Sequence, residues 1–275
     1  MSSMANKKKK TIGKYEVIKF PKDRKMVIDI MEQGIKKHYI KGLVEFDVTN
    51  GRKLIKEYKS KKGVSLSFTG WMLRCIGQAA SEHKDVHMLK KGKKKLYRFD
   101  DVDISIMVEK SVKGEKVPLP VIIRKTNEKT VEEITREIRD AQAEAVDEDV
   151  LLGLKKDEKF KRLFTSLPKF IRKITYWRFG RNPLLLKDFG GTISLTSVGM
   201  FGDLIGWGIP IGVQPLMFSF GAITKKPSVI GDKIEIRKIL HATILFDHDI
   251  IDGAPAARFL AELKVLIENG FGLEQ

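Results

Sequence analysis

Residues 246–260 read Phe-Asp-His-Asp-Ile-Ile-Asp-Gly-Ala-Pro-Ala-Ala-Arg-Phe-Leu, which places His248 four residues before the pair Asp252 and Gly253. The apolar residues before the histidine indicate a strand, and the Ala-rich stretch after the pair indicates a helix. Histidine is the side chain that most readily takes a proton from a thiol or hydroxyl at pH 7. The segment therefore predicts a general base presented by a strand-to-helix turn.

The same segment resembles the His-x-x-x-Asp-Gly signature of chloramphenicol acetyltransferases and of the acyltransferase component of 2-oxo-acid dehydrogenase complexes. The acyltransferase component is the closer match, because its motif continues as residues 252–260 do here. A glycine-rich strand and turn at 190–202 and paired strands at 102–108 and 117–122 also follow the family's order. The resemblance covers nearly the whole chain.

The resemblance implies a mixed α/β single domain with the chloramphenicol-acetyltransferase-like fold, which forms trimers. It implies that His248 deprotonates an incoming thiol or hydroxyl, which attacks the acyl carbonyl without an acyl-enzyme intermediate. At the family's oxyanion position this chain has Thr196, whose hydroxyl is expected to donate, with Ser197 and Ser194 as alternatives. Because the family's site lies between subunits, His248 of one chain is expected to face Thr196 of its neighbour.

The family also pairs the aspartate of the motif with an arginine from its first helix, which implies that Asp252 pairs with Arg24 to support the site. Gly253 is expected to permit the turn. Two positions depart from the family pattern. Asp249 follows the histidine where the family commonly has arginine, and, if close, it would favour the protonated imidazole. Residues 206–210 replace a Thr/Ile/Asn-rich stretch, which indicates a different acyl pocket.

The resemblance implies coenzyme A as a substrate, with an unassigned acceptor, no lipoyl group on this chain and no metal. The sequence predicts a disordered basic tail at residues 1–12 and a stand-alone catalytic domain at 13–275, without lipoyl or subunit-binding domains. Two other functions stay open. One is a non-catalytic trimer or cage assembly protein that binds a partner or membrane, and the other is the core of a 2-oxo-acid dehydrogenase complex served by a separate lipoyl protein.

Composition restricts the class of protein. The 275 residues carry 52 Lys+Arg and 35 Asp+Glu, a formal net charge of +17. This charge suits a phosphate-bearing substrate, whereas the absence of any recognisable nucleic-acid module or Arg/aromatic interleaving argues against nucleic acid. No apolar stretch is long enough to span a bilayer, and no secretion signal is present. Cys75, the single cysteine, lies in an apolar helical pattern and is expected to be buried, which fits a cytoplasmic protein.

Residues 147–187 are the least family-like part of the chain and mix aromatic side chains with many Lys and Arg. One interpretation is a helix that packs Phe164, Phe170 and Trp177 against this domain or a neighbouring subunit. The other is a segment that contacts an anionic membrane or a protein partner.

The remaining histidines predict no metal site. His83 and His87 are four residues apart, but no convincing third ligand accompanies them. Both are expected at the surface, as are His38 and His241.

Hydrophobic periodicity predicts helices over 23–38, 51–61, 67–82, 129–144 and 254–268, and strands over 43–48, 97–108, 116–124 and 233–246.

Overall fold

The structure, a computed structural model, describes residues 13–21, 24–112, 115–144, 166–180, 182–199 and 205–273. In chain order its elements are α1 Arg24–Gly34, β1 Tyr39–Asp47, α2 Thr49–Lys62, α3 Phe68–Glu82, the 3-10 helix η1 Lys84–His87, β2 Leu89–Lys91, β3 Lys95–Tyr97, β4 Ile104–Val112, β5 Glu115–Ile123, α4 Val131–Ala143, α6 Lys169–Gly180, α7 Pro183–Gly190, β6 Ile193–Ser197, β7 Leu216–Ile230, β8 Lys233–Asp247 and α8 Gly253–Asn269.

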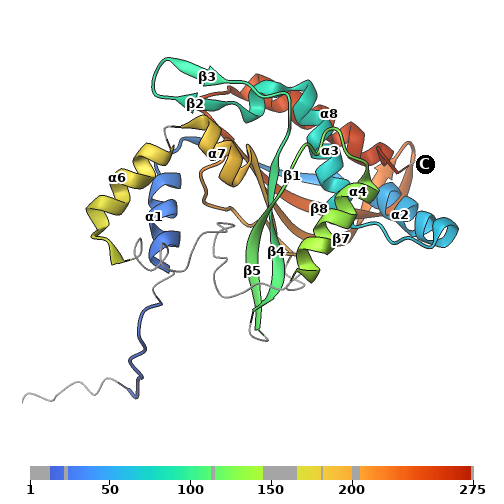
Figure 1. Cartoon of the computed structure of the whole chain (residues 1–275). Coiled ribbons are helices and arrows are strands. Elements are labelled where there is room, and N and C mark those ends of the chain that lie inside the picture. The colour runs from blue at the N-terminus through green and yellow to red at the C-terminus, as the bar shows by residue number, and fades with distance from the viewer. Residues whose placement is uncertain are drawn as a thin grey trace, which may run out of the picture.

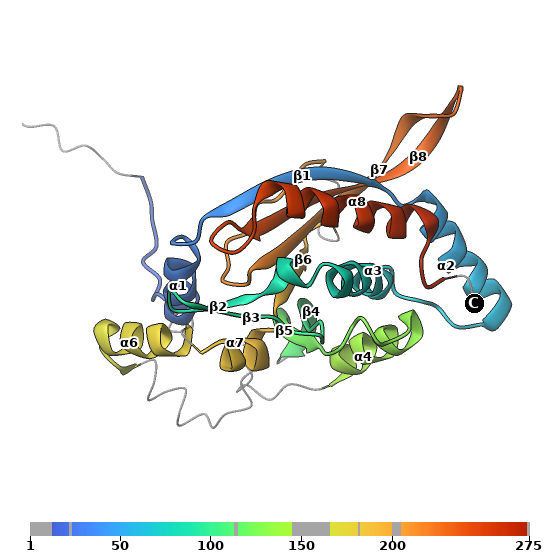
Figure 2. The ribbon, with the colours of Figure 1, turned by 90° about the horizontal axis from the view of Figure 1, so that it is seen from above.

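A six-stranded mixed sheet of order β1-β8-β7-β6-β4-β5 forms the centre of the fold. Strand β6 runs parallel to both of its neighbours, β4 and β7, and the other pairs are antiparallel. The ribbon β2-β3 is a separate two-stranded sheet. Figure 1 shows α1 and α6 side by side at one end of the molecule, with α2 at the other end. Figure 2 shows the far ends of β7 and β8 projecting from the body.

The core lies between the sheet and helices α3, α4 and α8. Phe259 of α8 packs its ring against Phe246 of β8, with centroids 5.8 Å apart. Trp71 of α3 is fully buried, and its indole N–H donates to the carbonyl of Phe271 at 3.1 Å. Cys75 is also fully buried, as expected, and burial raises the pKa of its thiol. These contacts tie the helical layer to the sheet.

Local signals in the sequence fix several element ends. Ser67 caps α3, because its hydroxyl accepts the amide N–H of Gly70 at 3.2 Å. Thr130 and Glu133 form a capping box at the start of α4. The predicted strand over 97–108 is only partly right, since β4 begins at Ile104. Hydrophobic periodicity does not predict η1, α7 or the β2-β3 ribbon.

The expectation of a surface position is wrong for His87, which is fully buried beneath α7. Its Nδ1 lies 2.9 Å from the Thr192 hydroxyl. Burial, followed by the positive charge of Lys187, lowers the pKa of His87 to about 4. A neutral imidazole is therefore part of the packed interior.

His241 of β8 is the second buried histidine. Its Nδ1 lies 3.1 Å from the Ala222 carbonyl, and its ring meets the indole of Trp207 edge-on with centroids 4.8 Å apart. The loop that contains Trp207 therefore covers this part of β8, which removes the histidine from solvent.

Helix α6 is fixed to α1 by a buried ion pair, in which Arg172 Nε lies 2.8 Å from Asp29 Oδ2. In α6, Phe170 and Trp177 are 65% and 53% exposed. Packing of these two rings against their own domain, as one interpretation of residues 147–187 expected, is therefore wrong. Phe164 lies outside the described residues. Contact of the exposed rings with a neighbouring subunit, a membrane or another partner stays an open alternative.

The buried His87 predicts how stability depends on pH. Between pH 6.5, near the ordinary histidine pKa, and about pH 4, the unfolded chain binds a proton that the folded chain excludes. The free energy of unfolding is therefore expected to fall as pH drops through this window. Replacement His87→Gln should flatten that fall in urea titrations between pH 7 and pH 4, whereas His83→Gln should not. An unchanged slope in His87→Gln would contradict this assignment.

Candidate active site

His248 directly follows the last residue of β8 and is half exposed, with 49% of its side chain accessible. Its amide N–H donates to the carbonyl of His38 at 2.6 Å. The amides of Ile250 and Ile251 both donate to the carbonyl of Asp247, which closes the turn before α8 begins at Gly253. The predicted strand-to-helix turn is therefore present, and it presents the imidazole to solvent.

The buried carboxylate of Asp247 stabilises this turn. The residue is 3% exposed, its carboxylate is paired with the ammonium group of Lys37, and it also accepts the amide N–H of Asp249 at 3.2 Å. Beside it, the Tyr39 hydroxyl donates to the carbonyl of Gln214 at 2.8 Å. Burial and the charge of Asp247 raise the pKa of Tyr39. Burial makes this ion pair costly to break, so it holds the end of β8 against the start of β1.

Asp252 lies behind the imidazole. Its Oδ1 is 3.5 Å from Nδ1 of His248, while its side chain is 85% exposed. A carboxylate beside Nδ1 favours the tautomer that carries its proton on Nδ1. The arrangement leaves Nε2 available to a substrate.

The expected pair between Arg24 and Asp252 does not form within the described part of one chain. Arg24 is exposed at the first position of α1, whereas the other end of that helix approaches the site. Eleven helical residues separate these ends by about 15 Å. Asp252 faces His248 instead, so the physical reason for the error is the direction of α1.

The structure changes the expectations for two more positions. Asp249 does not contact the imidazole of His248; its carboxylate lies 2.9 Å from Lys90 Nζ and 3.0 Å from His38 Nδ1. Those two contacts, Lys90 first, lower the pKa of Asp249 to about 2. At Gly253 an added Cβ would meet no described atom within 4 Å, and the residue is not in the left-handed region. Within one chain the turn therefore does not require glycine.

Thr196 lies on β6, far from the histidine of the same chain. In the sheet it pairs with Ser219 of β7, which pairs with Thr243 of β8. The five residues from Thr243 to His248 span about 17 Å along the strand, and two strand spacings add about 10 Å sideways. The two predicted catalytic groups are therefore about 19 Å apart within one chain. One chain cannot bring them together.

The surroundings of Thr196 contain an apolar surface. The loop over residues 205–211 crosses the sheet here, because a Cβ added at Gly208 would lie 3.2 Å from the Ser219 hydroxyl. Four apolar side chains next to this loop are about half exposed or more: Val198, Ile205, Ile209 and Ile211. Ser197 and Ser194, the alternative donors, are partly buried on the same strand. Exposed apolar patches of this kind are typical of protein interfaces.

Other site types are not formed by the described residues. Within those ranges, no group of three or more His, Cys, Asp or Glu side chains is arranged to hold a metal ion. None of the helices described here is both long and apolar enough to cross a membrane.

Comparison with known proteins identifies the family. The sequence profile described as "2-oxoacid dehydrogenases acyltransferase (catalytic domain)" matches residues 13–152 and 181–273. The chain belongs to this family. Its match leaves out residues 153–180, which contain α6, so this helix is an addition to the acyltransferase domain.

Among curated relatives, the lipoamide acyltransferase component of the branched-chain alpha-keto acid dehydrogenase complex of Bacillus subtilis is 26% identical over 82% of this chain and 46% of its own length. The succinyltransferase component of the mitochondrial 2-oxoglutarate dehydrogenase complex of Bos taurus is 36% identical over 32% of this chain and 20% of its own. The chain thus spans less than half the length of these relatives.

Solved structures confirm the expected mixed-sheet fold. A probable dihydrolipoamide acetyltransferase from Listeria monocytogenes superposes with a TM-score of 0.66 at 21% identity, covering 93% of this chain and 95% of that one. The cubic core of a pyruvate dehydrogenase multienzyme complex gives a TM-score of 0.69 at 18% identity, covering 97% and 96%. At these identities the likeness establishes the fold of the acyltransferase catalytic domain.

The separation of Arg24 from Asp252 predicts independent energetic effects. Replacements Arg24→Met and Asp252→Asn should change the free energy of unfolding additively, within about 0.5 kcal/mol, because distant side chains without shared partners do not couple. A double-mutant cycle from urea denaturation measures the coupling. A coupling energy of about 1 kcal/mol or more would show that the two charges pair after all.

Proposed function

We propose that this chain is an acyltransferase that moves an acyl group between coenzyme A and a thiol or hydroxyl acceptor by direct attack, with His248 as general base. The half-exposed imidazole at the end of β8, with Asp252 behind Nδ1, is the observation that carries the proposal. The family supplies the reaction class, because its members are acyltransferases.

The chemistry begins with a proton transfer. Nε2 of His248 takes the proton of the acceptor thiol, and the resulting thiolate attacks the carbonyl carbon of the acyl thioester. The carbonyl oxygen becomes an oxyanion, which accepts a hydrogen bond from the hydroxyl of Thr196. When the tetrahedral intermediate collapses, the carbon–sulfur bond to the leaving thiolate breaks, and the imidazolium returns its proton to that sulfur.

The two groups come from different chains in this proposal. Because about 19 Å separates Thr196 from His248 within one chain, Thr196 of a neighbouring subunit has to supply the oxyanion donor. The exposed apolar residues beside Thr196 provide a surface for that neighbour. A cyclic trimer gives each chain one neighbour on either side and so builds three such sites. Larger assemblies of trimers keep the same contact.

The relatives suggest an acceptor. Their names include lipoamide acyltransferase and dihydrolipoyllysine-residue succinyltransferase. A dihydrolipoyl thiol on another polypeptide or another domain is therefore the acceptor to test first. Turnover of acetyl-, succinyl- and isobutyryl-coenzyme A with dihydrolipoamide tests the proposal. No turnover of any thioester with any thiol or hydroxyl acceptor would favour the assembly-protein alternative.

Loss of the base should abolish the reaction. His248→Ala is expected to lower kcat by about 10²- to 10⁴-fold, because the imidazole performs the proton transfer and its half-exposed ring contributes little packing. Thermal melts and sedimentation should match those of the wild type. His83→Ala removes a histidine away from the site and serves as control. More than a tenth of wild-type turnover in His248→Ala would refute the assignment.

Loss of the oxyanion donor should act on the chemical step. Thr196→Val keeps the shape of the side chain but removes the hydroxyl, so kcat should fall by about 10²-fold or more while binding of coenzyme A stays within about twofold. Ser197→Ala and Ser194→Ala test the alternative donors. A wild-type kcat in Thr196→Val, together with a large loss of kcat in either serine variant, would assign the oxyanion donor to that serine.

A further inference from the structure

Helix α6 packs against α1 and α7. Residues 153–180 fall outside the family match, so α6 is not part of the shared acyltransferase domain. The guanidinium group of Arg172 fixes the helix, since Nε lies 2.8 Å from Asp29 Oδ2 and Nη1 donates to the carbonyl of Leu167 at 2.8 Å. The Arg172 and Asp29 side chains are only 7% and 2% exposed. A buried ion pair of this kind holds α6 against α1 in one orientation.

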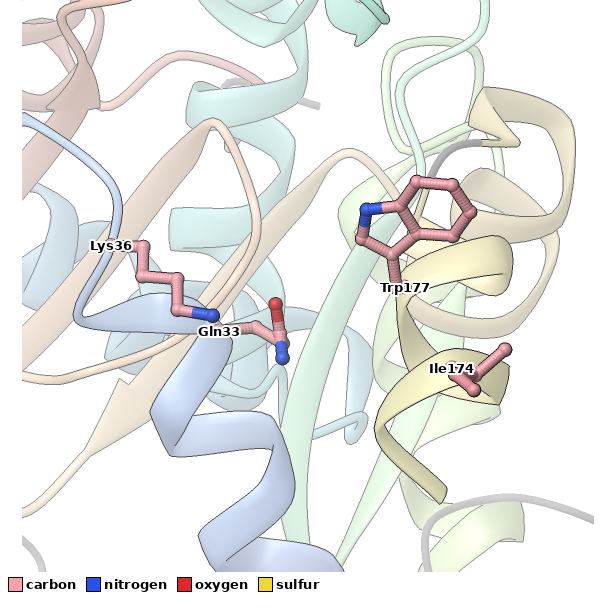
Figure 3. Close-up of a pocket in the computed structure, with 4 residues that line it drawn as sticks. All are labelled: Gln33, Lys36, Ile174 and Trp177. Atoms are coloured by element: carbon pink, nitrogen blue, oxygen red, sulfur yellow. The ribbon is translucent and has the colours of Figure 1, made fainter. Parts of the chain in front are cut away.

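Between the two helices lies a hollow of about 380 Å³, within the size range of small-molecule sites. Figure 3 shows Gln33 and Lys36 on the α1 side of the hollow, and Ile174 and Trp177 on the α6 side. The hollow thus combines an ammonium group, a carboxamide, an aliphatic side chain and an indole.

These four side chains match the nucleotide end of coenzyme A. An indole stacks on a purine ring, a lysine ammonium binds phosphate as a point charge, and a carboxamide pairs with the edge of adenine. The charge of Arg172 is neutralised by Asp29, but Arg178 in the last turn of α6 adds a positive charge. Lys36 and Arg178 therefore favour an anion.

The hollow is close to the proposed base along the chain. Lys36 is two residues before His38, a span of at most about 7 Å, and the carbonyl of His38 accepts the amide N–H of His248 at 2.6 Å. A ligand whose phosphates lie at Lys36 can therefore extend a flexible arm toward the imidazole.

We propose that the hollow between α1 and α6 binds the adenosine and phosphate end of coenzyme A, with adenine against Trp177 and a phosphate at Lys36. The pantetheine arm then carries the thiol toward His248. This inference rests on the proposed function and adds to it a nucleotide subsite supplied by α6. An anionic membrane is the competing occupant of the exposed α6 face. The nucleotide is favoured because Ile174 and Trp177 line a concave site together with two polar side chains of the α1 side.

The test compares ligands with and without the nucleotide. We expect Trp177→Ala and Lys36→Ala to raise the calorimetric Kd for coenzyme A by roughly tenfold, while kcat and KM for S-acetylpantetheine stay within about twofold. Adenosine 3′,5′-bisphosphate should compete with coenzyme A for the wild-type protein. Trp177→Phe should keep most of the affinity, since an aromatic face remains.

Two matched controls lie on the same helices. Phe170→Ala removes an aromatic ring that is 65% exposed on α6 but does not line the hollow, and Lys25→Ala removes an exposed lysine from the far end of α1. Neither should change the Kd for coenzyme A.

An unchanged Kd for coenzyme A in both test variants would overturn the inference. An equal loss of activity with S-acetylpantetheine, which lacks the nucleotide, would do the same. So would loss of binding to phosphatidylglycerol vesicles in Trp177→Ala while its affinity for coenzyme A is unchanged. The proposed function fails separately, if the wild type turns over neither thioester. In that case the Kd values of the variants for coenzyme A still show whether the hollow binds its nucleotide end.

Discussion

The register of β6, β7 and β8 decides how far apart Thr196 and His248 lie in one chain. It places Thr196 beside Ser219, and Ser219 beside Thr243, five residues before His248. Because a shift by one residue would turn every side chain of a strand to the opposite face, this register is fixed by the buried aromatic residues on the helical face, Phe218, Phe220 and Phe246. The fold therefore separates His248 from Thr196 within a chain, and the proposed chemistry requires a neighbouring chain.

A second group of contacts fixes the turn that carries His248. The ion pair of Lys37 with Asp247 and the hydrogen bond from His248 to His38 both join the end of β8 to the segment between α1 and β1. Asp249 adds the β2-β3 ribbon through Lys90. Segments far apart in the sequence thus converge beneath one imidazole. Helix α6 rests on α1, so its placement depends on the same scaffold.

The sequence predicted the parts of this molecule that depend on local pattern. Hydrophobic periodicity located α3, α4 and α8, and the motif located His248 at the turn. Long-range geometry could not be predicted in this way. The failed pairing of Arg24 with Asp252 depends on the direction of α1, and the burial of His87 depends on packing beneath α7. Lys37 and Lys90, which hold the site, carry no local signal, because an isolated lysine in a chain of net charge +17 reads as solvated surface.

In the proposed mechanism His248 and Thr196 act across a contact between chains, which subunit complementation can test. His248→Ala and Thr196→Val chains would be purified separately, dissociated, mixed in equal amounts and reassociated. In a random trimer about one quarter of the contacts join an intact His248 to an intact Thr196. Mixed trimers are therefore expected to recover about a quarter of the wild-type turnover per site. Hybrid trimers that assemble but stay as inactive as the two parent variants would contradict it.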